Sequence, residues 1–333
     1  MPRSSLLLLL LLLLPGCFTP RPSPIVHHPS PQSVPFIAQK PNYCGPAALA
    51  MLANYYGHNV SQDEIAGAIY LPEIRGTLTT ELANYAHRFN LWVRQYRGSR
   101  ADLHEKLSAG IPMIVLGRLG DRYHYFIVLD YRGDTLIVHS DTRPNLHLRE
   151  DDFLRWWNRA DCWTLLVCAP DRARWKLSAE EHNDLGVYSE RAGQWAGAEE
   201  HYRAAITLRP GNSYFHMNLG NVLLKQRRLK AAVDAFARAV ANDPENADAL
   251  NNLAWVYLEL GENLDKAVHL SRRAALLRPS HRAYYLDTLG NVFLKQGKPQ
   301  DAISAFEEAL AATTDREISL RETIRRHLNA AKQ

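Results

Sequence analysis

The chain of 333 residues has little net charge and few cysteines. Its formal net charge is +4 and its basic residues occur in short pairs rather than runs, so composition gives no argument for nucleic-acid binding. No Walker-type motif occurs, and no CxxC or i, i+4 histidine pair indicates a metal site. With 46% apolar and 22% charged residues, the sequence instead has the composition of a globular protein of two domains.

The longest apolar run, Leu6 to Leu14, follows Arg3 and is too short to span a bilayer as a permanent helix. Residues 1–17 are therefore predicted to be a targeting segment. The segment ends in Leu-Pro-Gly-Cys, which resembles the bacterial lipobox; the resemblance implies that Cys17 becomes the lipid-modified mature N-terminus. An ordinary signal peptide or an uncleaved anchor is the alternative. Residues 18–34 contain five prolines and are predicted to form an extended tether.

The segment Pro35 to Asn54 carries the strongest chemical signal in the chain. Cys44 precedes Gly-Pro and a run of good helix formers, which predicts a helix with Cys44 at its N-terminus. The positive end of a helix dipole stabilises a thiolate, so we expect a thiol pKa below its ordinary value. Gln39 supplies an amide donor five residues earlier. These are the parts of a cysteine acyl-transfer site that lacks only a base.

The sequence QKPNYCGPAAL around Cys44 resembles the nucleophile motif of the papain-like C39 and C39-like cysteine peptidases. That resemblance implies that Gln39 and the backbone N–H of Cys44 form the oxyanion hole. The separation of Gln39 and Cys44 is five residues, where six is the commoner arrangement. The alternative reading makes Cys44 a small core residue or one half of a disulfide.

His124 is the candidate base, because it opens the predicted strand YHYFIVLDY. A strand over 124–131, a turn at 132–134 and a strand over 135–139 form a hairpin that brings Asp141 beside His124. The segment HYFIVLDYRGDTLIVHSD resembles the second motif of the same peptidase family, in which an Asp or Asn orients the histidine. Ser140 is an alternative orienting group. A metal site built from these side chains and His139 is conceivable, but no ligand spacing supports it, and we expect no metal or cofactor.

The order of elements in residues 35–170 predicts an α+β domain of the papain-like kind. Helices are expected over 44–54, 61–70, 79–89, 99–109 and 152–159, and strands over 91–96, 113–116, 123–131, 135–139 and 163–167. Cys162 and Cys168 bracket the last strand, about 20 Å apart at the usual strand rise, so they are predicted to be buried thiols rather than a disulfide. Cys44 is then expected to be free.

Residues 179–316 contain four copies of a pattern with a period of about 34 residues. The pattern matches the tetratricopeptide repeat, and predicts an all-α solenoid followed by a capping helix in residues 317–333. Such a stack presents a groove for binding. Asn221 with Lys225, and Asn291 with Lys295, each share a helix face at i, i+4. Tetratricopeptide domains that hold peptide C-termini use similar pairs, although solvated surface residues are the alternative.

Together these features predict a lipid-anchored cysteine peptidase with a Cys44–His124–Asp141 triad, in the bacterial cell envelope and facing the periplasm. Its repeats are expected to bind a peptide or protein substrate or partner. Two other functions remain open: an acyl transferase or amidase of the same fold, and a catalytically silent protein-binding scaffold.

Overall fold

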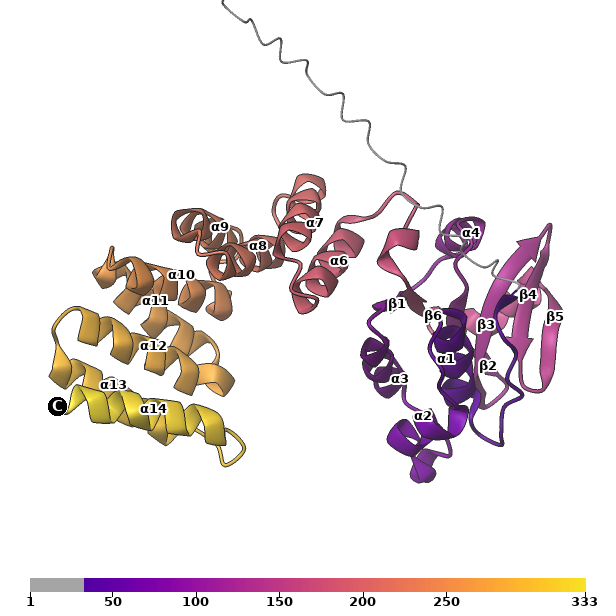
Figure 1. Ribbon diagram of the computed structural model, residues 1–333, viewed down its shortest axis with the longest axis horizontal. Helices are drawn as coiled ribbons and strands as arrows, with labels where there is room; N and C mark the ends of the chain where they lie inside the picture. The colour runs from indigo at the N-terminus through magenta and orange to yellow at the C-terminus, as the bar shows by residue number, and fades with distance from the viewer. Residues whose placement is uncertain (1–32) are drawn as a thin grey trace, which may run out of the picture.

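The computed structural model describes residues 33–333. The predictions for residues 1–17, for Cys17 and for most of the tether lie outside this range. The described chain consists of an N-terminal α+β domain and a C-terminal run of helices that ends far from it (Figure 1). Within residues 33–333, no helix is long and apolar enough to cross a membrane. The predicted fold class, a papain-like α+β domain followed by an all-α solenoid, is confirmed.

One antiparallel sheet forms the middle of the N-terminal domain. Its strand order is β1-β6-β2-β3-β4-β5. The strands are β1 (Trp92–Arg97), β2 (Met113–Leu119), β3 (Arg122–Arg132), β4 (Thr135–Ser140), β5 (Arg143–Arg149) and β6 (Trp163–Cys168). The helices are α1 (Cys44–Tyr55), α2 (Gln62–Ile69), α3 (Thr79–Ala86), α4 (Arg100–Ser108) and α5 (Glu150–Asn158), with short 3₁₀ turns η2 (Pro72–Ile74), η3 (His87–Phe89) and η4 (Pro170–Arg172).

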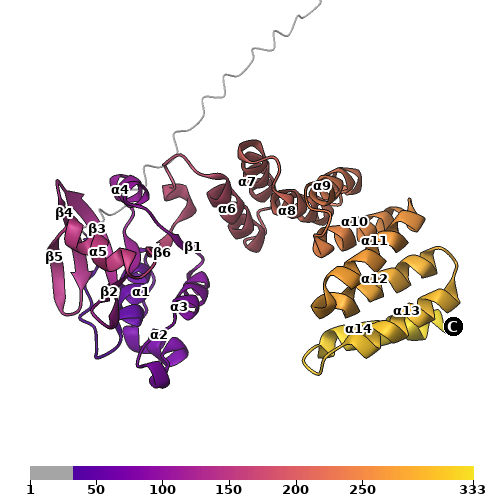
Figure 2. The same cartoon turned by 180° about the vertical axis from the view of Figure 1, so that it is seen from behind.

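Alternate side chains of β3 belong to two separate hydrophobic cores, because successive side chains of a strand point to opposite faces of the sheet. Tyr125 and Ile127 pack with α1, which is buried along nearly its whole length. Phe126 and Val128 pack on the other face, with Phe153 of α5. Figure 2 shows α5 in front of the sheet, on the side opposite to α1. The sheet is therefore covered by helices on both sides, and α1 is fixed against the middle of it.

Two elements differ from the sequence-based expectation. The helix predicted over 79–89 ends at Ala86 and continues as the 3₁₀ turn η3. Strand β5 was missed, because Pro144 and its polar neighbours suggest a loop. As the edge strand of the sheet it tolerates proline, and the alternation of Leu146 and Leu148 was the available signal.

Four helical pairs and a final helix follow. They are α6 (Ala179–Arg191) with α7 (Trp195–Leu208), α8 (Ser213–Lys225) with α9 (Leu229–Asn242), α10 (Ala247–Leu260) with α11 (Leu264–Leu277), α12 (Arg282–Lys295) with α13 (Pro299–Ala312), and α14 (Ile318–Ala331). A short 3₁₀ turn, η5 (Pro279–His281), precedes α12.

Glycine allows the two helices of a pair to approach closely. A Cβ added at Gly290 would lie 2.4 Å from the ring of Phe306, and Gly186 and Gly220 face Tyr202 and Phe236 in the same way. The third pair has Ala254 at the glycine position and Ser271 at the aromatic position, both fully buried. The third pair therefore lacks both the glycine and the aromatic ring that meet in the other three pairs.

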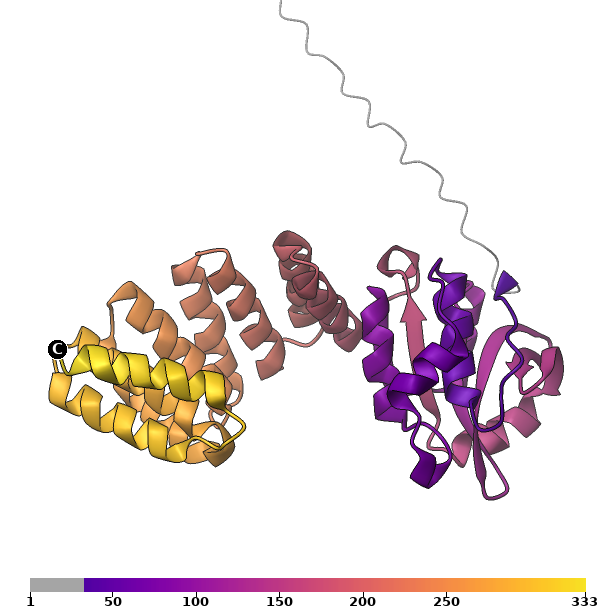
Figure 3. The same cartoon turned by 60° about the horizontal axis from the view of Figure 1, so that its bottom comes forward.

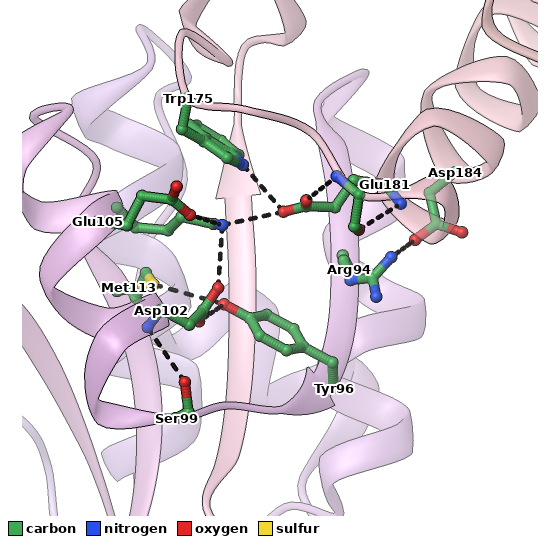
Figure 4. Close-up of polar contacts among 11 residues, drawn as sticks. Arg94, Tyr96, Ser99, Asp102, Glu105, Met113, Trp175, Glu181 and Asp184 are labelled. Atoms are coloured by element: carbon green, nitrogen blue, oxygen red, sulfur yellow. Dashed lines mark hydrogen bonds and ion pairs between the residues drawn. The ribbon is translucent and has the colours of Figure 1, made fainter. Parts of the chain in front are cut away.

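The first repeat is joined to the N-terminal domain by a polar network around a buried lysine. Lys106 of α4 is 2% exposed, and its ammonium group lies 2.9 Å from Asp102, 3.0 Å from Glu105 and 3.0 Å from Glu181 of α6. Trp175 lies over the same ammonium and donates its indole N–H to Glu181. Figure 4 shows these three carboxylates and Trp175 gathered around one point. Figure 3 shows the first repeat lying next to the N-terminal domain.

Candidate active site

Cys44 is the first residue of α1, as the sequence predicts. Gly45 packs closely against β3, because a Cβ there would lie only 3.2 Å from the Tyr125 ring. The absence of a side chain lets the N-terminus of α1 lie directly on the strand that carries His124. The backbone N–H groups of Tyr125, Gly45 and Cys44 itself all stabilise a charge on the Cys44 sulfur. Cys44 is half-buried and free, whereas Cys162 and Cys168 are buried free thiols.

Gln39 lies in an extended segment that is tied down on both sides. The backbone N–H of Gln39 donates to the carbonyl of Asp141 over 3.1 Å. The buried side chain of Gln62, from α2, accepts from the N–H of Lys40 and donates to the carbonyl of Ala38, each at 2.9 Å. The Gln39 side-chain amide itself makes no hydrogen bond within residues 33–333. The backbone hydrogen bonds around Gln39 thus fix its position, and its side-chain amide is available to a ligand.

His139 holds the start of that segment against the sheet. Its Nδ1 accepts from the N–H of Asn145, so Nε2 carries the proton and donates to the carbonyl of Val34 over 3.1 Å. Both ring nitrogens are therefore occupied in a buried position, and burial lowers the pKa of the ring. His139 positions the chain and has no free nitrogen for catalysis or for a metal.

His124 opens β3 and meets two polar partners from the end of β4. Its Nε2 lies 3.0 Å from the Ser140 hydroxyl, and its Nδ1 lies 4.0 Å from the Asp141 carboxylate. Asp141 adopts a left-handed backbone conformation, φ 52°, in the turn between β4 and β5. The hairpin brings all three residues together as predicted, but Ser140 makes the hydrogen bond and Asp141 supplies only a nearby charge.

Cys44, His124, Asp141 and Gln39 line one cavity of about 800 Å³. They come from α1, β3, the turn after β4 and the extended segment before α1. Exposed apolar side chains border the same cavity: Ile74 (54% exposed), Leu78 (46%) and Tyr123 (56%). Thr77 also lines it, with a buried hydroxyl that has no hydrogen-bond partner in the described part of the chain.

Electrostatics at the cavity favour a neutral Cys44–His124 pair. Burial raises the pKa of the Cys44 thiol, and the opposing backbone N–H groups do not overcome this effect. Burial also lowers the pKa of His124, against the charge of Asp141. The sequence-based expectation of a lowered thiol pKa is therefore wrong, because desolvation outweighs the effect of the helix N-terminus. No hydrogen bond joins the Cys44 sulfur to the His124 ring.

The sequence reasoning singled out the side chains of the cavity but not all of their supports. Ser140 was named as an alternative orienting group, and the structure gives it the hydrogen bond. Gln62 was missed, because a glutamine in the first turn of a helix has no distinguishing pattern and its partners are more than twenty residues away. Within residues 33–333, no cluster of three or more His, Cys, Asp or Glu side chains has the geometry to hold a metal ion.

The repeat residues predicted to bind a partner are placed in two different ways. Lys225 and Lys295 are exposed, and neither makes an ion pair within residues 33–333. Asn221 accepts a hydrogen bond from Asn252 of the next repeat, and Asn291 bonds to Asp287 of its own helix. Asn221 therefore links two repeats, and Asn291 also contacts Nδ1 of His327 in α14 at 3.3 Å, whereas the lysines are available to a ligand.

Comparison with known proteins separates the two halves of the chain. A family model described as the Peptidase C39 family matches residues 33–172. Models described as the tetratricopeptide repeat match residues 183–247, 217–280 and 283–315.

Curated relatives match only part of the chain. Protein O-mannosyl-transferase TMTC3 of Homo sapiens is 35% identical over 85 residues, which cover 26% of this chain and 9% of that protein. Protein FlbA of Caulobacter vibrioides is 28% identical over 131 residues, 39% of this chain and 22% of that protein. The chain thus spans less than a quarter of either relative.

Similar solved structures include MamA, at 25% identity and a TM-score of 0.38, with 40% of this chain and 72% of that chain covered. Another is YrrB, described as a TPR protein with an unusual peptide-binding site, at 19% identity and a TM-score of 0.40, with 46% and 75% covered. The family matches, together with the sheet and the helical pairs, assign both halves of the chain. Residues 33–172 form a domain of the peptidase C39 family, and residues 183–315 are tetratricopeptide repeats.

Proposed function

We propose that this protein is a cysteine peptidase that hydrolyses peptide bonds with Cys44 as nucleophile and His124 as base. The observation that carries the proposal is that Cys44, His124, Asp141 and Gln39, from four separate segments, line one cavity in a domain of a peptidase family. These are the side chains that acyl transfer requires: a thiol, an imidazole, a charge to support the imidazolium and an amide donor.

Reaction would begin from the neutral pair. With its proton on Nε2, His124 would donate to the Ser140 hydroxyl 3.0 Å away, and Nδ1 would accept the thiol proton as the sulfur attacks the substrate carbonyl carbon. The Asp141 carboxylate, 4.0 Å from Nδ1, would stabilise the resulting imidazolium. The Gln39 amide and the N–H of Cys44 would hold the oxyanion. The imidazolium then protonates the leaving amine, and water attacks the thioester with His124 again as base, which frees the acyl group.

The walls of the cavity support a peptide substrate with apolar side chains near the scissile bond. Ile74, Leu78 and Tyr123 expose about half of their surfaces there, and binding a peptide between them would remove this apolar surface from water. We propose that the repeats add a second contact with the substrate or with a partner. The ammonium groups of Lys225 and Lys295 are exposed and make no ion pair with any residue from 33 onward, so they suit carboxylates.

We also propose that the mature protein is attached to the bacterial envelope through lipid on Cys17 and faces the periplasm. The support is the lipobox-like Leu-Pro-Gly-Cys sequence after a short apolar run. Replacing Cys17 by serine should move the protein from the membrane fraction to the soluble fraction of expressing cells. An unchanged distribution on fractionation would rule out this mode of attachment.

The reactive state of Cys44 can be tested by alkylation of the full chain with iodoacetamide, followed by mass spectrometry. Only the thiolate reacts, and burial raises the pKa of Cys44 above that of an ordinary thiol. We therefore expect the rate of Cys44 labelling to keep increasing as the pH rises past the ordinary thiol pKa. Cys162 and Cys168 are matched internal controls and should stay unlabelled in the folded protein, because both are buried. Burial raises the pKa of Cys168 to about 12.

A labelling rate that is already maximal near neutral pH would contradict the neutral Cys44–His124 pair. Preferential labelling of Cys162 or Cys168 would contradict the choice of Cys44 itself.

A further inference from the structure

A second cavity lies where the first repeat meets the N-terminal domain. It has a volume of about 500 Å³, and we call it the junction groove. One wall is α6 and the other is η3 with β1 and the residues before it. Leu91 and Val93 give it an apolar floor. Its polar lining includes His87, Arg88, Arg94, Asp184 and Arg191.

The junction groove carries excess positive charge. Three arginines line it against one aspartate, and that aspartate, Asp184, is already paired with Arg94. Arg191 donates to Nδ1 of His87 over 3.1 Å, which fits a neutral ring, because burial and Arg191 lower the pKa of His87. Arg88 lies over the Tyr85 ring, 4.9 Å from its centre. Neither Arg88 nor Arg191 pairs with a carboxylate within residues 33–333.

The same helix connects this groove to the candidate active site. Leu78 and Thr79, at the start of α3, line the cavity of Cys44, while His87 and Arg88, directly after α3, line the junction groove. Nine residues separate Thr79 from Arg88, which is about 14 Å at the helical rise of about 1.5 Å per residue. An extended peptide covers about 14 Å in roughly four residues. An extended peptide of about four residues therefore spans the distance between the residue of α3 that lines the Cys44 cavity and the arginine after α3 that lines the junction groove.

We propose that the junction groove binds an acidic segment of the peptide substrate, about four residues or more from the bond that Cys44 cleaves. This inference rests on the proposed peptidase function. Arg88 and Arg191 would form charge-assisted hydrogen bonds with the carboxylates, a geometry that the forked guanidinium group favours. The position of the groove on α6 gives the repeats a direct part in substrate selection, because the wall they provide carries Arg191.

The test measures binding without turnover. The full chain with Cys44→Ala is titrated against a fluorescein-labelled synthetic peptide that contains two adjacent glutamates, and against the same peptide with glutamines. Fluorescence anisotropy should show binding of the glutamate peptide roughly tenfold tighter than that of the glutamine peptide, with the difference shrinking at high salt. Arg88→Glu and Arg191→Glu should each abolish most of this preference.

Arg159→Glu is the matched control, since Arg159 is exposed on the same domain but outside the groove. It should leave the preference unchanged. If a glutamate variant fails to fold, as judged by circular dichroism, Arg88→Gln and Arg191→Gln replace it and should still weaken the preference. Equal binding of the two peptides, or an equal loss in Arg159→Glu, would overturn the proposal. If the protein binds the glutamate peptide selectively but the wild type cleaves no peptide, the proposed peptidase function is wrong and the proposal for the junction groove still holds.

Discussion

Replacing Lys106 by methionine should destabilise the N-terminal domain by about 3 to 5 kcal/mol, the usual cost of removing one partner from a buried ion pair. Methionine keeps the length of the side chain but leaves Asp102, Glu105 and Glu181 facing one another without a positive charge. Burial alone would lower the pKa of Lys106, but its bonds to Asp102 and Glu181 raise it, so the ammonium is charged at neutral pH. Urea unfolding followed by tryptophan fluorescence measures the change.

Two further variants make the Lys106 prediction specific. Lys176→Met removes an exposed lysine from the same junction and should shift the urea midpoint little. Adding Glu181→Gln to Lys106→Met removes one unpaired carboxylate and should recover part of the loss. The expected recovery is electrostatic, because Glu181→Gln removes negative charge that Lys106 no longer balances. An unchanged urea midpoint in Lys106→Met at neutral pH would show that the network does not stabilise the junction.

The pH dependence of the network follows from its two pKa shifts. Hydrogen bonds from Ser178 and Lys106 outweigh burial and lower the pKa of Glu181, so its contribution to stability is present above the ordinary glutamate pKa and is lost as the pH falls through the lowered value. The raised pKa of Lys106 preserves its contribution until the pH rises through that value. The difference between wild type and Lys106→Met should therefore be largest at neutral pH.

The junction also reaches the far end of the helix that begins at Cys44. Arg172 is buried and donates to the Tyr55 hydroxyl over 2.7 Å and to the Gly110 carbonyl over 2.8 Å. Leu185 of α6 belongs to the core of the N-terminal domain. A chain cut near Arg174 would lose Glu181 and Leu185 and expose part of that core. The role of the repeats is thus better tested by point variants of the full chain.

Most of the fold was predictable because its signals are local. The helix after Cys44, the hairpin from His124 to Asp141 and the 34-residue period each lie within a short stretch of sequence. Lys106 was not predictable: RADLHEKLS has the composition of a solvated helix, and its buried partner Glu181 is 75 residues away. The predicted direction of the Cys44 pKa shift was wrong for a similar reason. Desolvation depends on tertiary packing, whereas the helix N-terminus can be recognised in the sequence.

Replacing His124 by alanine should lower the rate of peptide hydrolysis by about 10²- to 10⁴-fold, the usual contribution of a general base. Gln39→Ala should cost about 10²- to 10³-fold if its amide holds the oxyanion. In the wild type, hydrolysis should fall at acid pH only below the ordinary histidine pKa, because burial lowers the pKa of His124 and keeps the imidazole neutral to a more acidic pH. Steady-state rates on one peptide across a pH series measure all three effects.

The two neighbours of His124 should differ in their effects. Ser140→Ala removes the 3.0 Å hydrogen bond to Nε2, and a bond of that kind corresponds to about a tenfold loss of rate. Asp141→Asn removes a charge that is half-exposed and 4.0 Å away, so its effect should be smaller. A larger loss in Asp141→Asn than in Ser140→Ala would reverse this assignment and favour the Asp as the orienting group.

The most direct measurement is the appearance of new peptide termini when the full chain is incubated with a defined mixture of synthetic peptides and the products are identified by mass spectrometry. Wild type and a Cys162→Ala control should produce the same new termini, with free carboxylates that show transfer of the acyl group to water. Cys44→Ala should produce none. Cleavage by Cys44→Ala at the rate of the wild type, or no cleavage by the wild type of any peptide in the mixture, would contradict the assignment of Cys44 as the nucleophile of a peptidase.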